Sequence, residues 1–400
     1  MRLGLVVAFV CLFLAAALSP MPPGERAADR PALVPVSGEV VEDPAEAPAN
    51  QPDEPEADEP ATAEEPRRFD VVLTGDVLLH EGLWDTARRD GGGRLDFRPM
   101  LAPMRRTIER ADLAVCHLET PLAPPQGPYS GYPRFSAPPQ IAPALKWAGY
   151  DACTTASNHT VDTGFEGLVR TVGVLDRTGL AHTGSYATRR ASTTPALVEV
   201  TTTDGRAVRV GLVSATYGLN GLPVPSEAPW SVDLIDVPRI VARARAAREA
   251  GAEVVLVALH WGTDGYASIT DEQRRVADLL TRSKAIDLVY GHHAHIVQPI
   301  EKVNGRWVIF GLGNALAQQD VASPELYEGV AARVAFREKP SGRFAIVRVG
   351  ARPTLMTTYG ARPMRYLDVG RALVDPAWSY LQQRLLAARS AVLARVALPR

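Results

Sequence analysis

The stretch that decides the fold of this chain is IDLVYGHHAHIVQP, residues 286–299, in which an apolar run leads directly into three histidines. The whole chain has 400 residues and only eight histidines. Histidine is the commonest metal ligand among side chains and also carries protons near neutral pH. Three of them within four positions, at the end of an apolar run, therefore indicate a candidate reactive site.

Short apolar runs of the same kind recur and alternate with helix-like segments. The runs cover residues 69–76, 111–119, 150–159, 208–216, 252–260, 286–295 and 306–314. Near-continuous valine, isoleucine and leucine is typical of strands buried on both faces. Helix-like segments cover residues 164–179, 238–251, 271–283 and 378–397, and the third follows Thr270, a good helix cap. The alternation predicts an α/β fold.

Most of these apolar runs end in side chains that can bind a metal ion. They are Asp76, Glu119, Asn158 with His159, His260, the histidines of residues 292–295, and Asn314. In open α/β folds the carboxyl ends of the strands form the ligand crevice. Buried polar groups at this density are costly unless a metal ion or a substrate satisfies them. We therefore expect a site that holds one or two divalent ions, with oxygen and nitrogen ligands that suit Mn, Fe, Zn or Mg.

Four motifs stand in the order seen in the metal-dependent phosphatase superfamily, which the chain resembles. They are GDVLL (75–79), ASNHTVDTG (156–164), LHWG (259–262) and GHHAH (291–295). Within that superfamily the chain is most similar to the CapA family of capsule-synthesis proteins, associated with poly-γ-glutamate. The words that carry this resemblance are CHLETPL (116–122), PRFSAPP (133–139), residues 145–168, HWGTDGY (260–266), and residues 287–301 followed by IFGLGN (309–314). The resemblance covers residues 69–350 and implies a metallophosphatase-like α/β/β/α sandwich, with two packed sheets flanked by helices.

The resemblance also implies roles for particular residues. The implied metal ligands are Asp76, Glu119, Asn158, His260, His293 and His295. His159 would donate a proton or stabilise developing charge, and Asp162 would orient its ring. The candidate substrate-binding residues are Arg134, His117, Trp261 and Asn314.

The chain departs from the family pattern at several positions. Typical phosphatases have Asp-x-His after the first strand, but here the second position after Asp76 is Leu78, so one ion loses a ligand. His80 lies two residues further and is not assumed to replace that ligand. In GHHAH, alternate side chains of an extended segment face opposite ways. We therefore expect His293 and His295 to share a metal centre and His292 to have a structural role.

The N-terminal part has a different composition. Residues 1–19 carry one arginine before an apolar run, which predicts a signal peptide or a signal-anchor. Residues 20–67 are rich in proline, alanine and glutamate, which predicts a disordered linker. Residues 68–350 would form the CapA-like domain, and residues 351–400 a C-terminal extension ending in an amphipathic helix. The whole chain has a net charge of −2. Residues 1–66 have a net charge of −10, so residues 67–400 have a net charge of +8.

Two cysteines, Cys116 and Cys153, lie within apolar runs of the predicted domain. We interpret them as buried thiols that act as small hydrophobic groups, although a disulfide would be open to them if their strands were neighbours. Neither a phosphate-binding loop nor GxGxxG precedes a helix, which disfavours a nucleotide-binding fold. No basic run interleaves with aromatic residues, which argues against nucleic acid as a partner.

The sequence leaves three functions open. The leading hypothesis is a CapA-like protein, secreted or anchored to the outer face of the cytoplasmic membrane, that acts in synthesis, export or attachment of an anionic polymer such as poly-γ-glutamate, with membrane-bound capsule-synthesis subunits as partners. The first alternative is a secreted phosphoesterase that acts on a phosphate-containing substrate, with His159 protonating the leaving oxygen. The second is a non-catalytic scaffold that binds the polymer. The loss of the Asp-x-His histidine favours the scaffold, whereas the retained Asn158-His159 pair favours chemistry.

Overall fold

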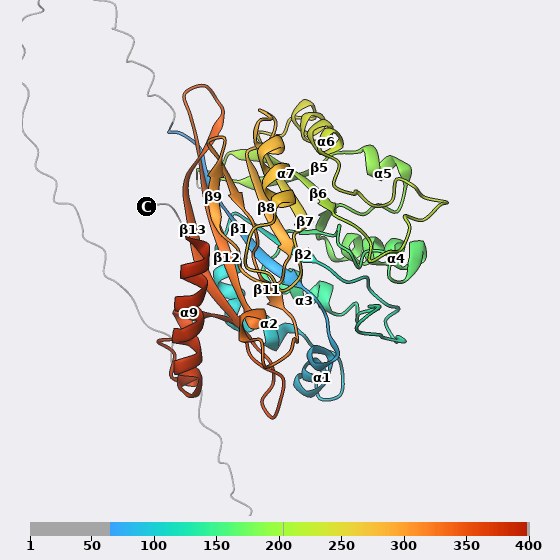
Figure 1. Ribbon diagram of the computed structural model, residues 1–400, viewed down its shortest axis with the longest axis vertical. Helices are drawn as coiled ribbons and strands as arrows, with labels where there is room; N and C mark the ends of the chain where they lie inside the picture. The colour runs from blue at the N-terminus through green and yellow to red at the C-terminus, as the bar shows by residue number, and fades with distance from the viewer. Residues whose placement is uncertain (1–64, 203, 398–400) are drawn as a thin grey trace, which may run out of the picture. The chain divides into compact units, whose positions relative to one another are not determined.

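The computed structural model describes residues 65–202 and 204–397 (Figure 1). The predicted signal segment and nearly all of the acidic linker lie outside these residues. Residues Ala63–Arg400 form one compact unit. Two β-sheets make up its centre, and helices cover their outer faces. The expected sandwich of two packed sheets flanked by helices is therefore confirmed.

The first sheet has eight strands. Their order is β14-β13-β12-β1-β2-β3-β4, and β11 pairs with β1. Strands β1 to β4 and β11 run parallel, whereas β12, β13 and β14 are joined by antiparallel pairs. The bounds are β1 Arg68–Val77, β2 Leu113–Leu118, β3 Ala152–Thr154, β4 Ala181–Thr183, β11 Asn314–Leu316, β12 Glu328–Glu338, β13 Phe344–Met356 and β14 Tyr366–Asp368.

The second sheet has six strands in the order β5-β6-β7-β8-β10-β9. Its four central strands are parallel, and an antiparallel strand closes each edge. The bounds are β5 Ala196–Thr201, β6 Ala207–Thr216, β7 Val254–Trp261, β8 Leu288–His293, β9 Ile300–Val303 and β10 Arg306–Ile309. All seven apolar runs of the sequence contain a strand of one of the two sheets.

Alternation along the strands explains why these runs are apolar throughout. In β1, Val71 and Leu73 pack between the two sheets, while Val72 packs against the helices on the outer face. In β7, Leu256 faces the space between the sheets and Val257 faces the helices on the other side. Because successive side chains point to opposite faces, a strand buried on both faces has no position left for a polar residue until it ends.

Helices α1 to α4 lie on the outer side of the eight-stranded sheet, and α6 and α7 cover the six-stranded sheet (Figure 1). The predicted cap of α7 is confirmed, because the Thr270 hydroxyl accepts from the Gln273 backbone and the Gln273 side chain accepts from the Thr270 backbone. The helix bounds are α1 Glu81–Asp90, α2 Arg98–Ile108, α3 Ile141–Ala148, α4 Gly164–Thr178, α5 Arg189–Thr193, α6 Val237–Glu249, α7 Asp271–Thr281, α8 Val369–Ala372 and α9 Gln382–Val396, with 3₁₀ turns at Pro324–Tyr327 and Pro376–Leu381.

The C-terminal residues are part of this unit. The predicted boundary at residue 350 falls inside β13, and β14 extends the same sheet. Helix α9 packs on β12 and β13 and lies beside β13 in Figure 1. Arg384 and Arg395 of α9 both bind the buried carboxylate of Glu328, at 2.6 and 2.7 Å. The final amphipathic helix therefore closes one edge of the domain.

The interpretation of the two cysteines needs correction. Strands β2 and β3 are neighbours, and Cys116 stands directly opposite Cys153 with the two Cα atoms 4.5 Å apart. The structure joins the two residues in a disulfide. Sequence alone could not show this, because it did not place the two strands side by side.

Within residues 65–202 and 204–397, no helix combines the length and the apolar character needed to cross a bilayer.

Candidate functional site

The site lies where the carboxyl ends of strands from both sheets meet. β1 ends near Asp76, β2 near His117 and Glu119, β7 at His260 and β8 at the histidines. Strands β7 and β8 are in register, so that His260 lies opposite His292. Gly75 allows β1 to approach the chain that enters β11, because a Cβ atom there would lie 2.1 Å from the Gly313 carbonyl oxygen. Gly75 therefore allows β1 to pair with β11 in the same sheet, which places Asp76 opposite Asn314.

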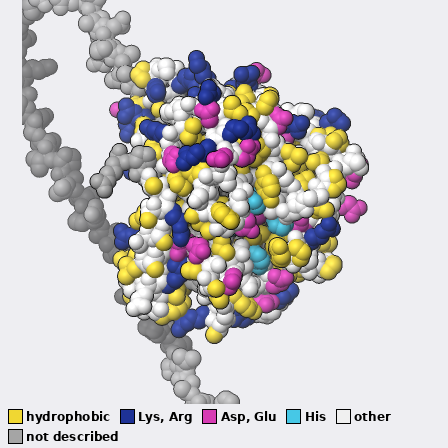
Figure 2. All heavy atoms as spheres, viewed as in Figure 1, with side chains coloured by type: hydrophobic (Ala, Val, Ile, Leu, Met, Phe, Trp, Pro, Cys, Tyr) yellow, Lys and Arg dark blue, Asp and Glu magenta, His cyan; other side chains and the backbone are white. Residues whose placement is uncertain are grey.

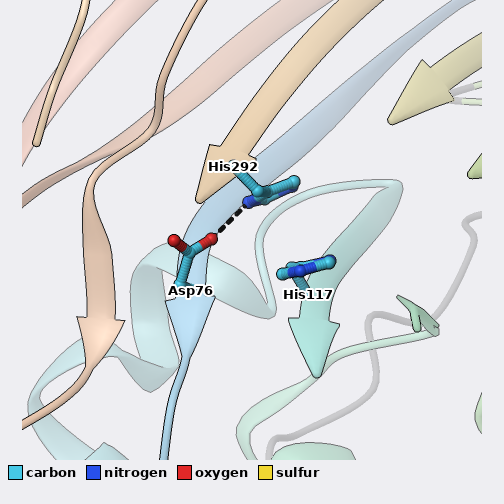
Figure 3. A group of neighbouring side chains, drawn as sticks. All are labelled: Asp76, His117 and His292. Carbon is cyan, nitrogen blue, oxygen red and sulfur yellow. Dashed lines mark hydrogen bonds and ion pairs between the residues drawn. The ribbon is translucent and has the colours of Figure 1, made fainter. Parts of the chain in front are cut away.

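One group of potential ligands consists of Asp76, His117 and His292 (Figure 3). The Nδ1 atom of His292 lies 2.7 Å from Oδ1 of Asp76. The ring of His117 stacks on that of His292, with 4.1 Å between centroids. All three side chains are buried, and they come from β1, β2 and β8. The Nε2 atom of His292 is buried without a hydrogen-bond partner among the described residues.

A second group shares Asp76 and adds Glu119 and His295. The Nδ1 atom of His295 lies 3.0 Å from Oδ2 of Asp76, and its Nε2 atom lies 3.7 Å from Oε1 of Glu119. Glu119 is 1% exposed, and neither of its carboxylate oxygens has a hydrogen-bond partner in the part of the chain that the structure describes. A buried carboxylate without partners is costly. Asp76 therefore stands between two groups that could each hold an ion.

His260 and Asn158 extend these groups. Nε2 of His260 lies 2.9 Å from Oδ1 of Asn158 and 3.7 Å from Oε1 of Glu119, while its Nδ1 lies 3.0 Å from Nε2 of His117. The other nitrogen of His117 bonds the Thr154 hydroxyl. The predicted ligands Asp76, Glu119, Asn158, His260 and His295 are therefore brought together in one connected cluster, which also contains His117.

His292 and His293 lie differently from the expected alternation. His293 has φ of 87° and His295 has φ of 56°, so the extended geometry ends at His293 and alternation no longer applies. His292 lies on the same face of β8 as Leu288 and Tyr290, and its Nδ1 contacts Asp76. His293 donates its backbone N–H to Oδ2 of Asp76, and its Nδ1 is buried without a partner among the described residues. Its ring packs against Tyr217, 4.5 Å between centroids.

His159 follows β3 and forms the pair with Asp162 that the resemblance implied. Its Nδ1 lies 2.7 Å from Oδ2 of Asp162, and the same oxygen accepts the backbone N–H of Phe135 at 2.8 Å. The ring of Phe135 packs edge-on against His159. These contacts fix the orientation of the imidazole and leave its Nε2 atom as the nitrogen available to a substrate.

The charge distribution around Asp76 follows from burial and proximity. Burial raises the pKa of Asp76, but hydrogen bonds from His292 and His295 outweigh it and hold the pKa well below its usual range. Burial lowers the pKa of His295, but Glu119 and Asp76 outweigh that effect and raise it to about 10. Burial raises the pKa of Glu119 well above its usual range. Burial lowers the pKa values of His117 and His260, and the neighbouring imidazoles lower them further. Both pKa values therefore lie well below the usual range.

A pocket of about 700 Å³ opens beside this cluster. Figure 2 shows histidine side chains in cyan within a hollow of the face that it presents. The lining includes His159, His293 and His295 on one side and the exposed Arg134 on another. Polar and aromatic groups therefore surround a space in which a substrate could contact both the buried cluster and His159.

The candidate substrate-binding residues fall into different places. Arg134 lines the pocket, but Trp261 is buried and donates its indole N–H to the Phe310 carbonyl, away from the pocket. Asn314 is also buried, and its Oδ1 accepts from Nδ1 of His295 at 3.0 Å. His117 belongs to the buried cluster. His80 lines the pocket but belongs to neither group of potential ligands around Asp76.

Three pocket residues escaped the sequence reasoning, namely Tyr217, Asn220 and Asp264. Asn220 accepts from Nδ2 of Asn158 at 3.1 Å through its Oδ1, so it fixes the amide of a potential ligand. Asn220 has a φ of 52°, a conformation that asparagine tolerates better than most residues. A signal was present, because Tyr217 and Asn220 directly follow the apolar run 208–216 and Asp264 follows 252–260.

The residues present fit a divalent cation. Both oxygens of Glu119, Nε2 of His292 and Nδ1 of His293 are buried and lack hydrogen-bond partners in the described ranges. Carboxylate and imidazole donors together suit Mn, Fe or Zn. The number of ions remains a prediction, and so does the assignment of each ligand.

Comparison with known proteins adds a family to this geometry. The family model described as "Bacterial capsule synthesis protein PGA_cap" matches residues 70–319. A probable polyglutamine synthesis accessory protein of Mycobacterium tuberculosis is 29% identical over 214 residues, which cover 50% of this chain and 52% of that protein. The PGA biosynthesis protein CapA of Bacillus subtilis is 28% identical over 186 residues, which cover 44% of each chain. The chain spans about half the length of these curated relatives.

Solved structures show a weaker likeness. A calcineurin-like phosphoesterase from Bacillus subtilis has a TM-score of 0.47 and 18% identity, and the alignment covers 72% of this chain and 90% of that one. A putative 5'-nucleotidase from Staphylococcus aureus has a TM-score of 0.43 and 15% identity, with 80% and 58% covered. TM-scores below 0.5 are too low to indicate a shared function.

Proposed function

Because the chain belongs to the bacterial capsule synthesis family PGA_cap, we propose that it acts in the synthesis, export or attachment of an anionic capsule polymer of the poly-γ-glutamate type. The proposal includes a metal-dependent hydrolytic step at the pocket beside Asp76. It also includes a position outside the cytoplasmic membrane, supported by the apolar N-terminal segment and the acidic linker of the sequence, and contact with membrane-bound subunits that make the polymer.

The observation that carries this proposal is the state of Glu119. Its carboxylate is buried, has no hydrogen-bond partner among the described residues, and lies 3.7 Å from the nearest nitrogens of both His260 and His295. If Glu119 had only a structural role, the free-energy cost of burying its carboxylate without partners would remain. A bound cation removes that cost. A divalent ion held there would act as a Lewis acid on a phosphoryl or carbonyl oxygen.

Other residues around the pocket would transfer a proton, bind the substrate and orient the potential ligands. His159, oriented by Asp162, can hold a proton at Nε2 and deliver it to a leaving oxygen or nitrogen. Arg134 is exposed at the pocket and can bind a carboxylate or phosphate of the substrate through its planar guanidinium group. Asn220 holds the Asn158 amide, and Asn314 holds the His295 ring.

A secreted phosphoesterase is the second candidate function. The paired His159 and Asp162 favour it, because protonation of a leaving alkoxide requires an acid held in one orientation. The two candidates share the site and differ in the bond that breaks, a phosphoester in one case and a γ-glutamyl amide in the other.

The test compares the full chain with Glu119→Gln after reconstitution with Mn²⁺ or Zn²⁺. Bound metal is measured by elemental analysis, and turnover is measured on bis-p-nitrophenyl phosphate and on γ-glutamyl oligomers. We expect at least one ion per chain for the wild type, with both metal and turnover lost in the variant. Glu166→Gln, an exposed position on α4, is the matched control and should behave as the wild type.

Each result has a distinct meaning. Turnover of γ-glutamyl oligomers supports the leading function, and turnover of the phosphodiester alone supports the phosphoesterase. Less than one ion per chain with no turnover would contradict both of these functions. The remaining function would be a scaffold that binds the polymer without catalysis.

A further inference from the structure

Seven arginines surround two adjoining hollows on the eight-stranded sheet. The larger hollow, of about 700 Å³, is lined by Arg333, Arg348, Arg352 and Arg389 among others. The smaller, of about 60 Å³, is lined by Arg106, Arg110, Arg333, Arg352 and Arg371. Arg333 and Arg352 line both hollows, so the two lie side by side. None of the seven lines the pocket beside the candidate metal centre.

The fold gathers these arginines from five elements and from the segment that follows α2. On β12 and β13 the register pairs Arg333 with Gly350, Ala331 with Arg352 and Ala335 with Arg348. Alternate residues share a face, so Arg333, Arg348 and Arg352 all project from the same face of the sheet. Arg106 lies in the last turn of α2 and Arg110 just after that helix ends, Arg371 lies in α8, and Arg389 lies in α9. In Figure 2 dark-blue side chains lie beside the region of α9.

Most of this charge is unpaired. Arg333 binds Asp70 at 2.6 Å, and Arg352 binds Asp368 at 3.0 Å. The guanidinium groups of Arg106, Arg110, Arg348, Arg371 and Arg389 form no ion pair with any carboxylate in residues 65–202 or 204–397. Like charges gathered on one surface repel each other, and an anionic ligand relieves that repulsion. Only two of the seven arginines are paired with a carboxylate among the described residues, so the surface is strongly positive.

We propose that this surface, the arginine groove of Arg106, Arg110, Arg333, Arg348, Arg352, Arg371 and Arg389, binds a polycarboxylate chain and holds it on the domain while the distant pocket acts. Arginine binds carboxylates through two parallel hydrogen bonds, which lysine does not form, and all seven basic residues of the groove are arginines. Arg348 and Arg352 lie four residues apart on one strand, which places them about 13 Å apart. A chain with a carboxylate on every unit can bind both.

The lining separates a polycarboxylate from a nucleic acid. Among the residues that the structure describes, no aromatic side chain lines either hollow. Single-stranded nucleic acids are bound by aromatic side chains that stack on the bases in addition to basic groups. The small and aliphatic residues between the arginines, such as Ala351 and Leu393, suit a flexible polymer without rings. The choice of poly-γ-glutamate rests on the function proposed above.

The test is binding of fluorescent poly-γ-glutamate to the purified full chain at about 0.15 M salt, where exposed charges further apart than about 8 Å are screened. Arg348→Glu combined with Arg389→Glu should weaken binding by at least about tenfold, because each lost contact of 1.4 kcal/mol is a tenfold change. Both side chains are exposed and unpaired, so the fold should be unaffected. Arg177→Glu combined with Arg190→Glu makes the same change in net charge at exposed positions of α4 and α5. This control should bind within about twofold of the wild type, because only the groove makes direct contacts.

Three outcomes would overturn the proposal. They are no binding by the wild type, equal loss in the groove and control variants, and displacement of the polymer by single-stranded DNA of equal charge at lower concentration than by unlabelled polymer. The proposed function is tested separately. The groove variant should keep its bound metal and its turnover of small substrates, whereas Glu119→Gln should keep polymer binding and lose metal.

Discussion

Among single residues, the histidines of the stretch 292–295 show three different environments. His292 binds Asp76 through Nδ1, His293 faces the pocket and packs on Tyr217, and His295 lies between Asp76, Glu119 and Asn314. Alternation along a strand predicts two environments, not three. The positive φ angles at His293 and His295 produce the third, because they turn the backbone away from the extended form.

Replacing His293 with alanine should remove bound metal while leaving the fold intact. The Nδ1 atom of His293 is buried and has no partner among the described residues, so its loss leaves no other group unsatisfied. Metal is measured by elemental analysis, and folding by circular dichroism. His182→Ala is the matched control, because His182 bonds Asp176 outside the site. Unchanged metal content in His293→Ala would show that His293 is not a ligand.

Metal affinity should rise with pH. Without metal, His295 has a pKa of about 10 and carries a proton near neutral pH, and burial raises the pKa of Glu119. Only the deprotonated forms bind a metal, so each proton released gives about a tenfold gain in affinity per pH unit up to the pKa. Titration of Mn²⁺ between about pH 6 and 8, with the released protons measured in a weak buffer, checks this expectation. An affinity that is constant over this range would contradict it.

Asp162→Asn should lower turnover without removing metal. Asn keeps an oxygen that can accept from the Phe135 N–H and from Nδ1 of His159, but it removes the negative charge that lies beside the imidazole. We expect turnover to fall by about 10²-fold or more, with a shifted pH profile and unchanged metal content. Asp176→Asn, at the exposed partner of His182, serves as the control. Loss of metal in Asp162→Asn would assign Asp162 to the metal centre instead.

At the level of elements, helix α9 is held by a buried carboxylate. Glu328 is 4% exposed at its side chain and binds both Arg384 and Arg395, which are about one quarter exposed. The helix carries few buried apolar residues, so these pairs fix its position on β12 and β13.

Glu328→Ala should therefore lower the free energy of unfolding by about 3 kcal/mol, the lower end of the range for breaking a buried pair. Urea unfolding at one salt concentration measures it. Glu272→Ala removes an exposed pair with Arg275 and should lower stability by less than about 1 kcal/mol. Equal effects of the two changes would show that the Glu328 pairs do not hold α9.

For the whole molecule, opposite charges are separated along the chain. Residues 1–66 carry −10 and residues 67–400 carry +8. Seven arginines of the domain gather around the arginine groove, whereas the charged groups of the candidate metal centre are buried. Salt screens exposed charges far more than buried ones.

Raising NaCl from about 0.05 to 0.5 M should therefore weaken polymer binding by more than tenfold and change metal affinity by less than about threefold. Both affinities are measured on the full chain by the same titrations, with sodium nitrate as a check on chloride binding to the metal. Salt-independent polymer binding would exclude the groove as an electrostatic surface.

The sequence by itself determined the fold class and most of the site. Runs of valine, isoleucine and leucine can only be satisfied in strands buried on both faces, and polar residues at their ends gather at one edge of a parallel sheet. These local patterns predict one cluster at the strand ends, and the resemblance to the CapA family implies that Asp76, Glu119, Asn158, His260 and His295 belong to it and that Asp162 orients His159.

Tertiary structure alone decided the contacts that depend on which segments become neighbours. The pairing of β2 with β3 joins Cys116 to Cys153, the packing of the two sheets brings His292 of β8 to Asp76 of β1, and the register of β12 with β13 collects Arg333, Arg348 and Arg352 on one face. Trp261 likewise donates its indole N–H to the Phe310 carbonyl and therefore does not line the pocket. Strand order, register and φ angles are set by packing between residues far apart in the chain, and a local pattern does not contain that information.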